Sequence, residues 1–155
     1  MRNVVWMEEK YAFVMMVKEK WWREFCRLSH EGRRVFSYVS GPRAPPKWAS
    51  LLFFYVSKPA GNIGGYAEFV ERKVGRPEEL WKEHGNETVF GSEDEYFQFI
   101  KWKQKASYIR FKNLQEAANP IPLNNVCSLL GVNKLARKGF YISRETAEKM
   151  IELMR

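Results

Sequence analysis

The sequence predicts an α+β fold built on a curved, mostly antiparallel sheet or a small barrel. Short apolar or alternating runs typical of strands recur along the chain, but they do not alternate strictly with long helical patterns, which argues against a doubly wound parallel sheet. The chain has 155 residues, of which 45% are hydrophobic and 15% aromatic. We therefore expect a single domain spanning residues 1–155 with a core of its own.

The first half of the chain contains four predicted strands and one predicted helix. The run Tyr11–Val17 is continuously apolar, as in a buried central strand. Apolar residues then recur at helical spacing over Lys20–Ser29, and Gly32 ends this helix. Gly64 and Gly65 permit a bulge or a close backbone approach at the start of the fourth strand. The second to fourth strands are predicted at Val35–Val39, Leu51–Val56 and Ile63–Lys73.

An irregular loop, Gly41–Ser50, is predicted between two of these strands. Its three prolines would prevent it from joining a sheet ladder. The loop carries Arg43, Lys47 and Trp48, which places a flat ring beside two cations. Trp48 has two interpretations with equal support: it stacks on a nucleic-acid base, or it plugs the end of a barrel.

The second half of the chain begins with two predicted acidic helices. Pro77 suits the first turn of one of them, which ends at Gly85, and Ser92 caps the other, Glu93–Trp102. A strand is predicted within Ala106–Leu123. The remaining predicted elements are a helical turn at 124–130, an extended piece at 139–142 and a final helix capped by Ser143.

The predicted strand within Ala106–Leu123 has two different faces. Ser107, Ile109 and Phe111 alternate with Tyr108, Arg110 and Lys112, so one face is mainly apolar and the other is aromatic and basic. Two prolines near the end of the stretch remove backbone donors and force an extended exit. Such a strand could belong to the core on one side and contact a polyanion on the other.

Charge is unevenly distributed along the chain, which has a net charge of +8. Residues 18–48 contain eight basic and three acidic residues, and residues 101–112 contain five basic and no acidic ones. Residues 68–95 contain four basic and nine acidic residues. This segregation predicts a positive and a negative face, although chance clustering on a solvated surface is the alternative. A positive face favours a polyanionic partner such as RNA.

No catalytic, metal-binding or cofactor motif is present in the sequence, so we expect no catalytic residue, metal or cofactor. Cys26 and Cys127 lie among apolar neighbours without metal-ligand spacing, which predicts buried thiols in a reducing compartment. His30 and His84 follow predicted helix ends, where a structural role is expected.

The N-terminal region predicts neither a membrane span nor a signal peptide. Its apolar run of residues 12–17 is far too short to cross a bilayer, and Glu8, Glu9 and Lys10 interrupt any signal-peptide core. We therefore expect a soluble cytoplasmic protein without membrane contact.

The order of several motifs resembles the PUA-like superfamily, in particular its ASCH and EVE branches and archaeal proteins of unknown function near them. The resemblance covers most of the chain and implies a pseudo-barrel of about five to six mostly antiparallel strands with flanking helices. It also implies RNA or modified-nucleotide binding in a cleft. The motifs that carry the resemblance are Val17-Lys18, Gly32-Arg33-Arg34, Gly64-Gly65-Tyr66-Ala67-Glu68, Pro77-Glu78-Glu79-Leu80-Trp81, Tyr108-Ile109-Arg110-Phe111-Lys112-Asn113, Pro120-Ile121-Pro122-Leu123 and Gly139-Phe140-Tyr141-Ile142-Ser143.

The same resemblance bears on catalysis, because some ASCH proteins are described as amidohydrolases or nucleases. Their pattern is Gly-x-Lys-x-x-Glu-x-Arg after the first helix. In this chain Gly32 fits the pattern, and Arg34 stands in place of the lysine. Ser37 and Val39 replace the glutamate and the arginine. Because a serine cannot serve as the acid–base group, the sequence favours a chain without enzymatic activity.

Three functions remain open from the sequence. The first is a non-catalytic RNA-binding module for tRNA, rRNA or a modified nucleotide, which would recognise a modified or flipped base in a basic, aromatic-lined cleft. The second is a small nucleoside- or RNA-processing enzyme of the ASCH type, with Glu68 as the nearest carboxylate. The third is a protein-interaction subunit that uses the acidic helices of residues 77–102. The predicted RNA-binding residues are Lys18, Lys20, Trp21, Arg34, Arg43, Lys47, Trp48, Lys58, Arg110, Lys112, Arg137 and Lys138.

Overall fold

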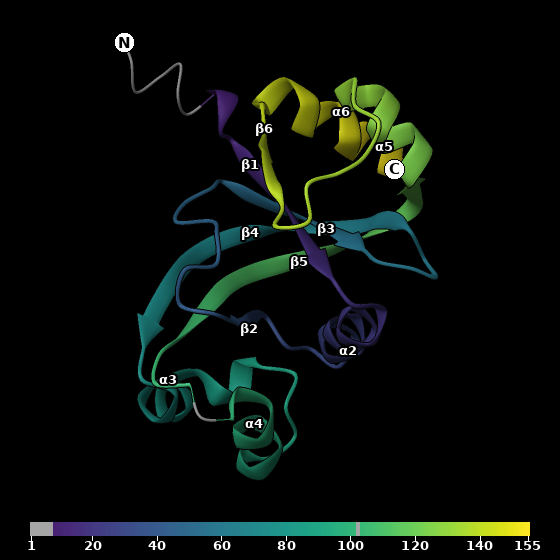
Figure 1. The fold of residues 1–155 in the computed structure, drawn as a ribbon. Coiled ribbons are helices and arrows are strands. Elements are labelled where there is room, and N and C mark those ends of the chain that lie inside the picture. Colours follow the sequence, from purple (N-terminus) through teal and green to yellow (C-terminus); the bar gives the residue numbers. More distant parts are fainter. Residues whose placement is uncertain (1–7, 102) are drawn as a thin grey trace.

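The computed structural model describes residues 8–101 and 103–155, and its elements follow the predicted order (Figure 1). The strands are β1 Ala12–Val17, β2 Val35–Ser40, β3 Leu51–Val56, β4 Asn62–Gly75, β5 Ala106–Pro122 and β6 Phe140–Ile142. The helices are α2 Glu19–His30, α3 Pro77–His84, α4 Glu93–Ile100, α5 Leu123–Leu130 and α6 Arg144–Met154, with a short 3-10 helix η1 at Gly85–Glu87. Trp102, the predicted end of α4, lies outside the described residues.

These strands form one six-stranded sheet in the order β2-β5-β4-β3-β1-β6. β1 and β3 run parallel, with Val17 opposite Val56, and each of the other neighbouring pairs is antiparallel. The predicted mostly antiparallel α+β fold is therefore confirmed. The long strands β4 and β5 form a bent ribbon with several register shifts, and such shifts increase the local twist of a sheet (Figure 1).

Glycines allow the bent ribbon to accept a helix at close range. One register shift lies between Ile63 and Gly65, and the indole ring of Trp22 from α2 packs against this point. A Cβ atom on Gly65 would overlap the Gln115 carbonyl oxygen and lie 2.9 Å from the Trp22 ring. Gly64 leaves similarly little room. The predicted close backbone approach is confirmed.

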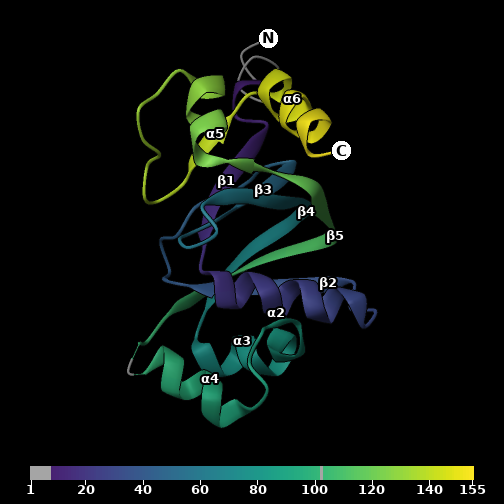
Figure 2. The ribbon, with the colours of Figure 1, turned by 90° about the vertical axis from the view of Figure 1, so that its right-hand side faces the viewer.

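Alternation along β1 divides the core between its two faces. Phe13, Met15 and Val17 pack with Phe25 of α2 and with apolar residues of β2, β3 and β5. Ala12 and Val14 belong to a second cluster, which includes residues of α5 and α6. Figure 2 shows α5 and α6 at one end of the molecule, α3 and α4 at the other, and α2 beside the strands between them.

A third cluster covers the start of β5 and corrects one prediction. Leu80 of α3 and Tyr96 and Ile100 of α4 pack against Tyr108, which is fully buried. Tyr108 was expected on an exposed aromatic and basic face. The two acidic helices instead fold back over this end of β5, so Tyr108 belongs to the core.

The two cysteines lie in different environments. Cys26 is buried in α2, as expected, whereas Cys127 in α5 is only partly buried, so the prediction of two buried thiols is wrong for Cys127. Within the described residues, none of the helices is both long enough and apolar enough to cross a bilayer.

Candidate functional site

The predicted cations do not converge on one cleft. Lys18 and Lys58 follow the neighbouring ends of β1 and β3, where the backbone N–H of Ser57 donates to the Val17 carbonyl at 3.0 Å. Arg137 and Lys138 precede β6, which runs antiparallel to β1 and so brings them toward the same end of the sheet. These four cations form the first group.

The loop of residues 41–50 lies at the opposite end of β3, because β3 begins directly after it and ends before Lys58. A six-residue strand spans about 20 Å, so Lys47 and Lys58 are separated by roughly that length of backbone. Arg34 and Lys112 lie at a third place, where the start of β2 pairs with β5. These cations therefore lie at three places along the sheet.

The loop 41–50 is tied to the sheet and presents two exposed cations. Hydrogen bonds tie it to the rest of the fold: Ser107 Oγ to the Gly41 carbonyl (2.7 Å), Arg72 Nη1 to the Ala44 carbonyl (3.0 Å), Tyr141 Oη to the Trp48 carbonyl (3.2 Å), the Ser50 N–H to the Tyr11 carbonyl (2.8 Å), and the Phe69 N–H to the Ser50 carbonyl (3.3 Å). Arg43 and Lys47 are exposed and make no ion pair within residues 8–101 and 103–155. Trp48 is partly buried, so it is less accessible to a ligand than the two exposed cations.

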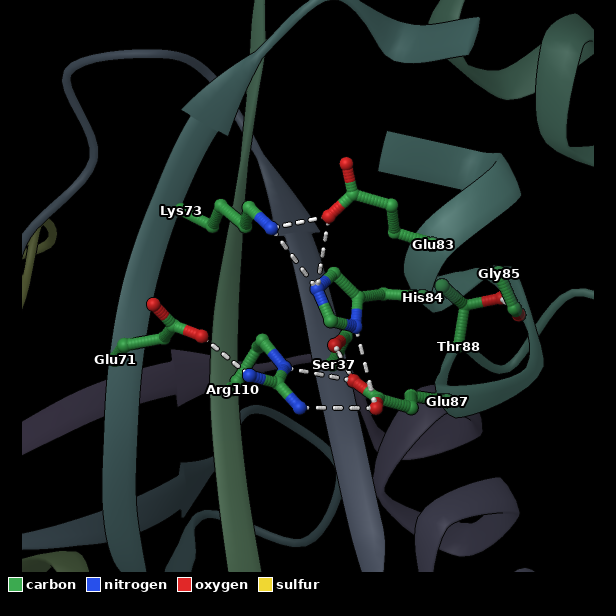
Figure 3. Close-up of polar contacts among 9 residues, drawn as sticks. All are labelled: Ser37, Glu71, Lys73, Glu83, His84, Gly85, Glu87, Thr88 and Arg110. Atoms are coloured by element: carbon green, nitrogen blue, oxygen red, sulfur yellow. Dashed lines mark hydrogen bonds and ion pairs between the residues drawn. The ribbon is translucent and has the colours of Figure 1, made fainter. Parts of the chain in front are cut away.

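Arg110 differs from the other predicted cations because its charge is already used inside the protein (Figure 3). Its Nε and Nη2 atoms donate to the two carboxylate oxygens of Glu87 at 2.9 and 3.1 Å, and its Nη1 atom donates to Glu71. Only 16% of its side chain is exposed. Phosphate binding would have to compete with this bidentate pair, so we leave Arg110 out of the candidate interface.

Ser37 lies beside the same carboxylate. Its hydroxyl donates to Glu87 Oε1 at 2.9 Å, and in the β2–β5 register Ser37 is opposite Arg110 (Figure 3). The resemblance to the ASCH pattern implies a glutamate at the position of Ser37. In this chain a carboxylate from η1 and a guanidinium from β5 lie beside that serine. Sequence reasoning missed Glu87 because it is 50 residues away, and only the excess of acidic residues in 68–95 pointed to this region.

His84 extends this polar cluster toward β4 (Figure 3). Its Nδ1 atom lies 3.3 Å from Glu87 Oε2, and its Nε2 atom lies 3.4 Å from Lys73 Nζ. Lys73 also contacts Glu83. The cluster therefore contains three carboxylates, two cations and one imidazole, so its charges largely cancel. Its position at the end of α3 fits the structural role expected for His84.

The protonation state of Glu87 follows from its partners. Burial raises the pKa of this carboxyl, but hydrogen bonds from Arg110 and Ser37 outweigh burial, and the pKa lies below its ordinary value. Glu87 is therefore ionised at neutral pH. It can accept a proton or balance the charge of Arg110, but it has no proton to donate.

A small gap with aromatic lining lies beside Ser37. A cavity of about 20 Å³ lies among Trp21, Ser37, Phe90 and Phe99. The Trp21 ring packs edge-on against Phe90, with centroids 5.6 Å apart, and Lys20 Nζ lies 4.4 Å from the Trp21 ring centre. This space holds about one water molecule, so a base could enter only if these rings moved.

The enzymatic alternative named Glu68, but this residue lies elsewhere. Glu68 is exposed on β4 and accepts a hydrogen bond from the side-chain amide of Asn113. The carboxylate beside Ser37 is Glu87. In the part of the chain that the structure describes, no group of three or more histidine, cysteine or acidic side chains has an arrangement that could hold a metal ion.

The fold was compared with known proteins. No protein-family model and no curated protein matches the sequence. The crystal structure of ASCH from Zymomonas mobilis matches with a TM-score of 0.72 and 19% identity, over 94% of this chain and 96% of that chain. A serine-to-alanine variant of the same protein matches with a TM-score of 0.74 and 17% identity, over 94% of this chain and 98% of that chain. A tyrosine-to-phenylalanine variant matches with a TM-score of 0.71 and 19% identity, over 92% of this chain and 97% of that chain.

These matches show that the chain has the ASCH fold. The α+β pseudo-barrel implied by the resemblance to the PUA-like superfamily is confirmed at the level of fold.

Proposed function

We propose that this chain is a cytoplasmic, non-catalytic RNA-binding module that contacts backbone phosphates through the loop 41–50. The observation that carries the proposal is the presentation of Arg43 and Lys47 as exposed cations on a loop that hydrogen bonds hold to the rest of the fold. A loop that is already ordered loses little conformational entropy on binding. Each phosphate contact would add affinity by releasing counterions.

The charge of the chain and its fold support RNA over an acidic protein or a membrane as the partner. The net charge is +8, and the ASCH resemblance implies RNA or modified-nucleotide binding. The competing hypothesis of protein interaction relies on the acidic helices of residues 77–102. Several carboxylates of this segment already form ion pairs with cations or with His84, which leaves fewer for a partner: Glu78, Glu79, Glu83 and Glu87.

Base recognition is the finer part of this proposal. Trp48 lies in the same loop as Arg43 and Lys47 and is partly buried, so a splayed or modified base next to a bound phosphate could stack on its ring. Stacking on an aromatic ring contributes about 1–3 kcal/mol per base. A Trp48→Leu variant should therefore bind single-stranded RNA about 5- to 150-fold more weakly while keeping its salt dependence. Unchanged affinity would assign Trp48 to packing alone.

A titration of single-stranded RNA and of tRNA across a salt series tests the proposal. The double variant Arg43→Gln/Lys47→Gln should reduce the slope of log K against log salt by about 1.4 for a single strand and weaken binding roughly 10- to 30-fold at 0.1 M salt. The matched control is Lys18→Gln/Lys58→Gln, which removes two exposed charges at the other end of β3. Equal effects of the two variants, or a flat salt response, would contradict the proposal.

One observation favours the enzymatic alternative, namely the ionised Glu87 beside Ser37. The reaction would be hydrolysis of a modified nucleoside with Glu87 as the general base. This function is tested by incubating the protein with acetylated or methylated nucleosides and detecting the products by mass spectrometry. Product that is lost in Glu87→Gln but retained in Glu68→Gln would support it. An absence of product with the wild-type chain would exclude it for these substrates.

A further inference from the structure

A basic hollow lies where β4 ends and β5 begins. It has a volume of about 490 Å³, which is enough for a nucleotide unit. Its lining comes from the start of α3 and from the segment that joins α4 to β5. The lining residues are Arg76, Glu78, Lys101, Lys103, Gln104 and Lys105.

Positive charge dominates this hollow. Four of its lining residues are cations, and Glu78 is the one lining carboxylate among the described residues. Arg76 shares its charge with Glu78 at 3.8 Å and with Glu79 at 4.0 Å. The three lysines are exposed and make no ion pair in the described part of the chain. The sequence indicated this positive stretch, but the lysines were not among the predicted binding residues.

Backbone contacts place the lysines at the end of α4. The Lys101 N–H donates to the Phe97 carbonyl at 2.8 Å, and the Lys103 N–H donates to the Ile100 carbonyl at 3.4 Å. Cations are favourable at a helix C-terminus, so a purely structural role for these lysines is the competing explanation. That role predicts a loss of stability on substitution and no change in ligand affinity.

The hollow lies near the start of the loop 41–50. Gly75 at the end of β4 pairs with Ala106 of β5, and the next residue, Ser107, donates to the Gly41 carbonyl at 2.7 Å. Arg43 is therefore at the same end of the sheet as Lys105.

We infer that this hollow binds phosphodiester groups of RNA next to those held by the loop 41–50, so that the interface has two parts. The inference rests on the proposed function. It adds Lys101, Lys103 and Lys105 to the interface and makes RNA length a determinant of affinity, because only a longer strand reaches both parts.

The experiment compares Lys103→Gln/Lys105→Gln with Lys82→Gln/Lys149→Gln, which removes two exposed lysines from other parts of the surface. Binding of short and long single-stranded oligonucleotides is measured by fluorescence anisotropy across a salt series, after circular dichroism has verified folding. For the long oligonucleotide, Lys103→Gln/Lys105→Gln should reduce the slope of log K against log salt by about 1.4 and weaken binding roughly 10- to 30-fold. For a short oligonucleotide that spans only the loop, Lys103→Gln/Lys105→Gln should bind as tightly as the control variant.

Acetylation footprinting of the wild-type chain provides a second readout. Bound long RNA should protect Lys103 and Lys105 from acetylation and leave Lys149 reactive. Identical binding by the two lysine variants, together with unprotected Lys103 and Lys105, would overturn the inference. In that case weaker binding by Arg43→Gln/Lys47→Gln would still support the proposed function. An absence of salt-dependent RNA binding by the wild-type chain would overturn both.

Discussion

The Ser37 hydroxyl donates a hydrogen bond to the Glu87 carboxylate at 2.9 Å and so joins β2 to η1. The same carboxylate accepts two hydrogen bonds from Arg110 of β5. Through these contacts, one partly buried glutamate connects the edge of the sheet to the segment between α3 and α4. Ser37 therefore takes part in an interaction that holds two parts of the fold together.

Removal of this carboxylate should destabilise the fold. Glu87→Gln should lower the free energy of unfolding by about 1–3 kcal/mol, because hydrogen bonds to charged groups are lost and Arg110 keeps only Glu71 as a carboxylate partner. Ser37→Ala should cost about 0.5–1.5 kcal/mol. Urea denaturation measures both, with exposed Glu9→Gln as a control expected to change stability by less than about 0.5 kcal/mol. A Glu87 variant as stable as this control would contradict the role given to the carboxylate.

The contribution of Glu87 should depend on pH in a defined direction. Its pKa in the folded chain lies below the ordinary value of 4.5, so its stabilising effect is complete above about pH 4.5 and is lost as the pH falls through the folded pKa. The stability difference between the wild type and Glu87→Gln should therefore be constant near neutral pH and shrink in acid. Denaturation curves from neutral to acidic pH measure the difference in unfolding free energy between the two proteins. A difference that stays constant in acid would contradict the lowered pKa of Glu87.

Gly65 should tolerate no side chain. A Cβ atom there would overlap the Gln115 carbonyl oxygen, and Trp22 blocks movement on the other side. Gly65→Ala should destabilise the fold by about 2–4 kcal/mol, since backbone must move to relieve the overlap. Gly41→Ala is the matched control, because a Cβ atom at Gly41 would have nothing within 4 Å. Similar melting temperatures for the two variants would show that the helix–ribbon contact is looser than described.

The two thiols should differ in reactivity. Burial, with a further effect of Glu116, raises the pKa of Cys26 to about 12, so this thiol stays protonated in mildly alkaline buffer. Cys127 is only partly buried. A thiol-specific chromogenic reagent should modify one cysteine in the native chain and both after denaturation. In Cys127→Ser the native chain should show almost no reaction, and rapid modification of that variant would place Cys26 at the surface.

Patterns local in sequence predicted the fold well. Apolar runs marked β1 and β3, glycines marked the bulge where Trp22 packs, and Ser92 and Ser143 accept the expected capping hydrogen bonds from Glu95 and Thr146. Each of these signals depends on residues close together in the chain. The exception, Tyr108, is instructive: alternation correctly put it on the opposite face from Ile109, but could not show that α3 and α4 cover that face.

The site was harder to predict because it depends on contacts between distant residues. Nothing near Arg110 in sequence indicates that Glu71 and Glu87 neutralise its charge. Likewise, the lysines of residues 101–105 become part of a hollow only because α3 starts beside them. Charge counts along the chain located the positive segments but gave no information on which cations remain unpaired.

The most direct test of the central claim is to crosslink RNA to the wild-type chain and identify the attached peptides. Single-stranded RNA containing 4-thiouridine would be irradiated with the protein, and the digested peptides would be analysed by mass spectrometry. We predict crosslinks to residues 41–50, where Arg43 and Lys47 are presented, and with longer RNA also to residues 101–105. Crosslinks confined to residues 57–61 and 131–139, at the other end of β3, would contradict the account.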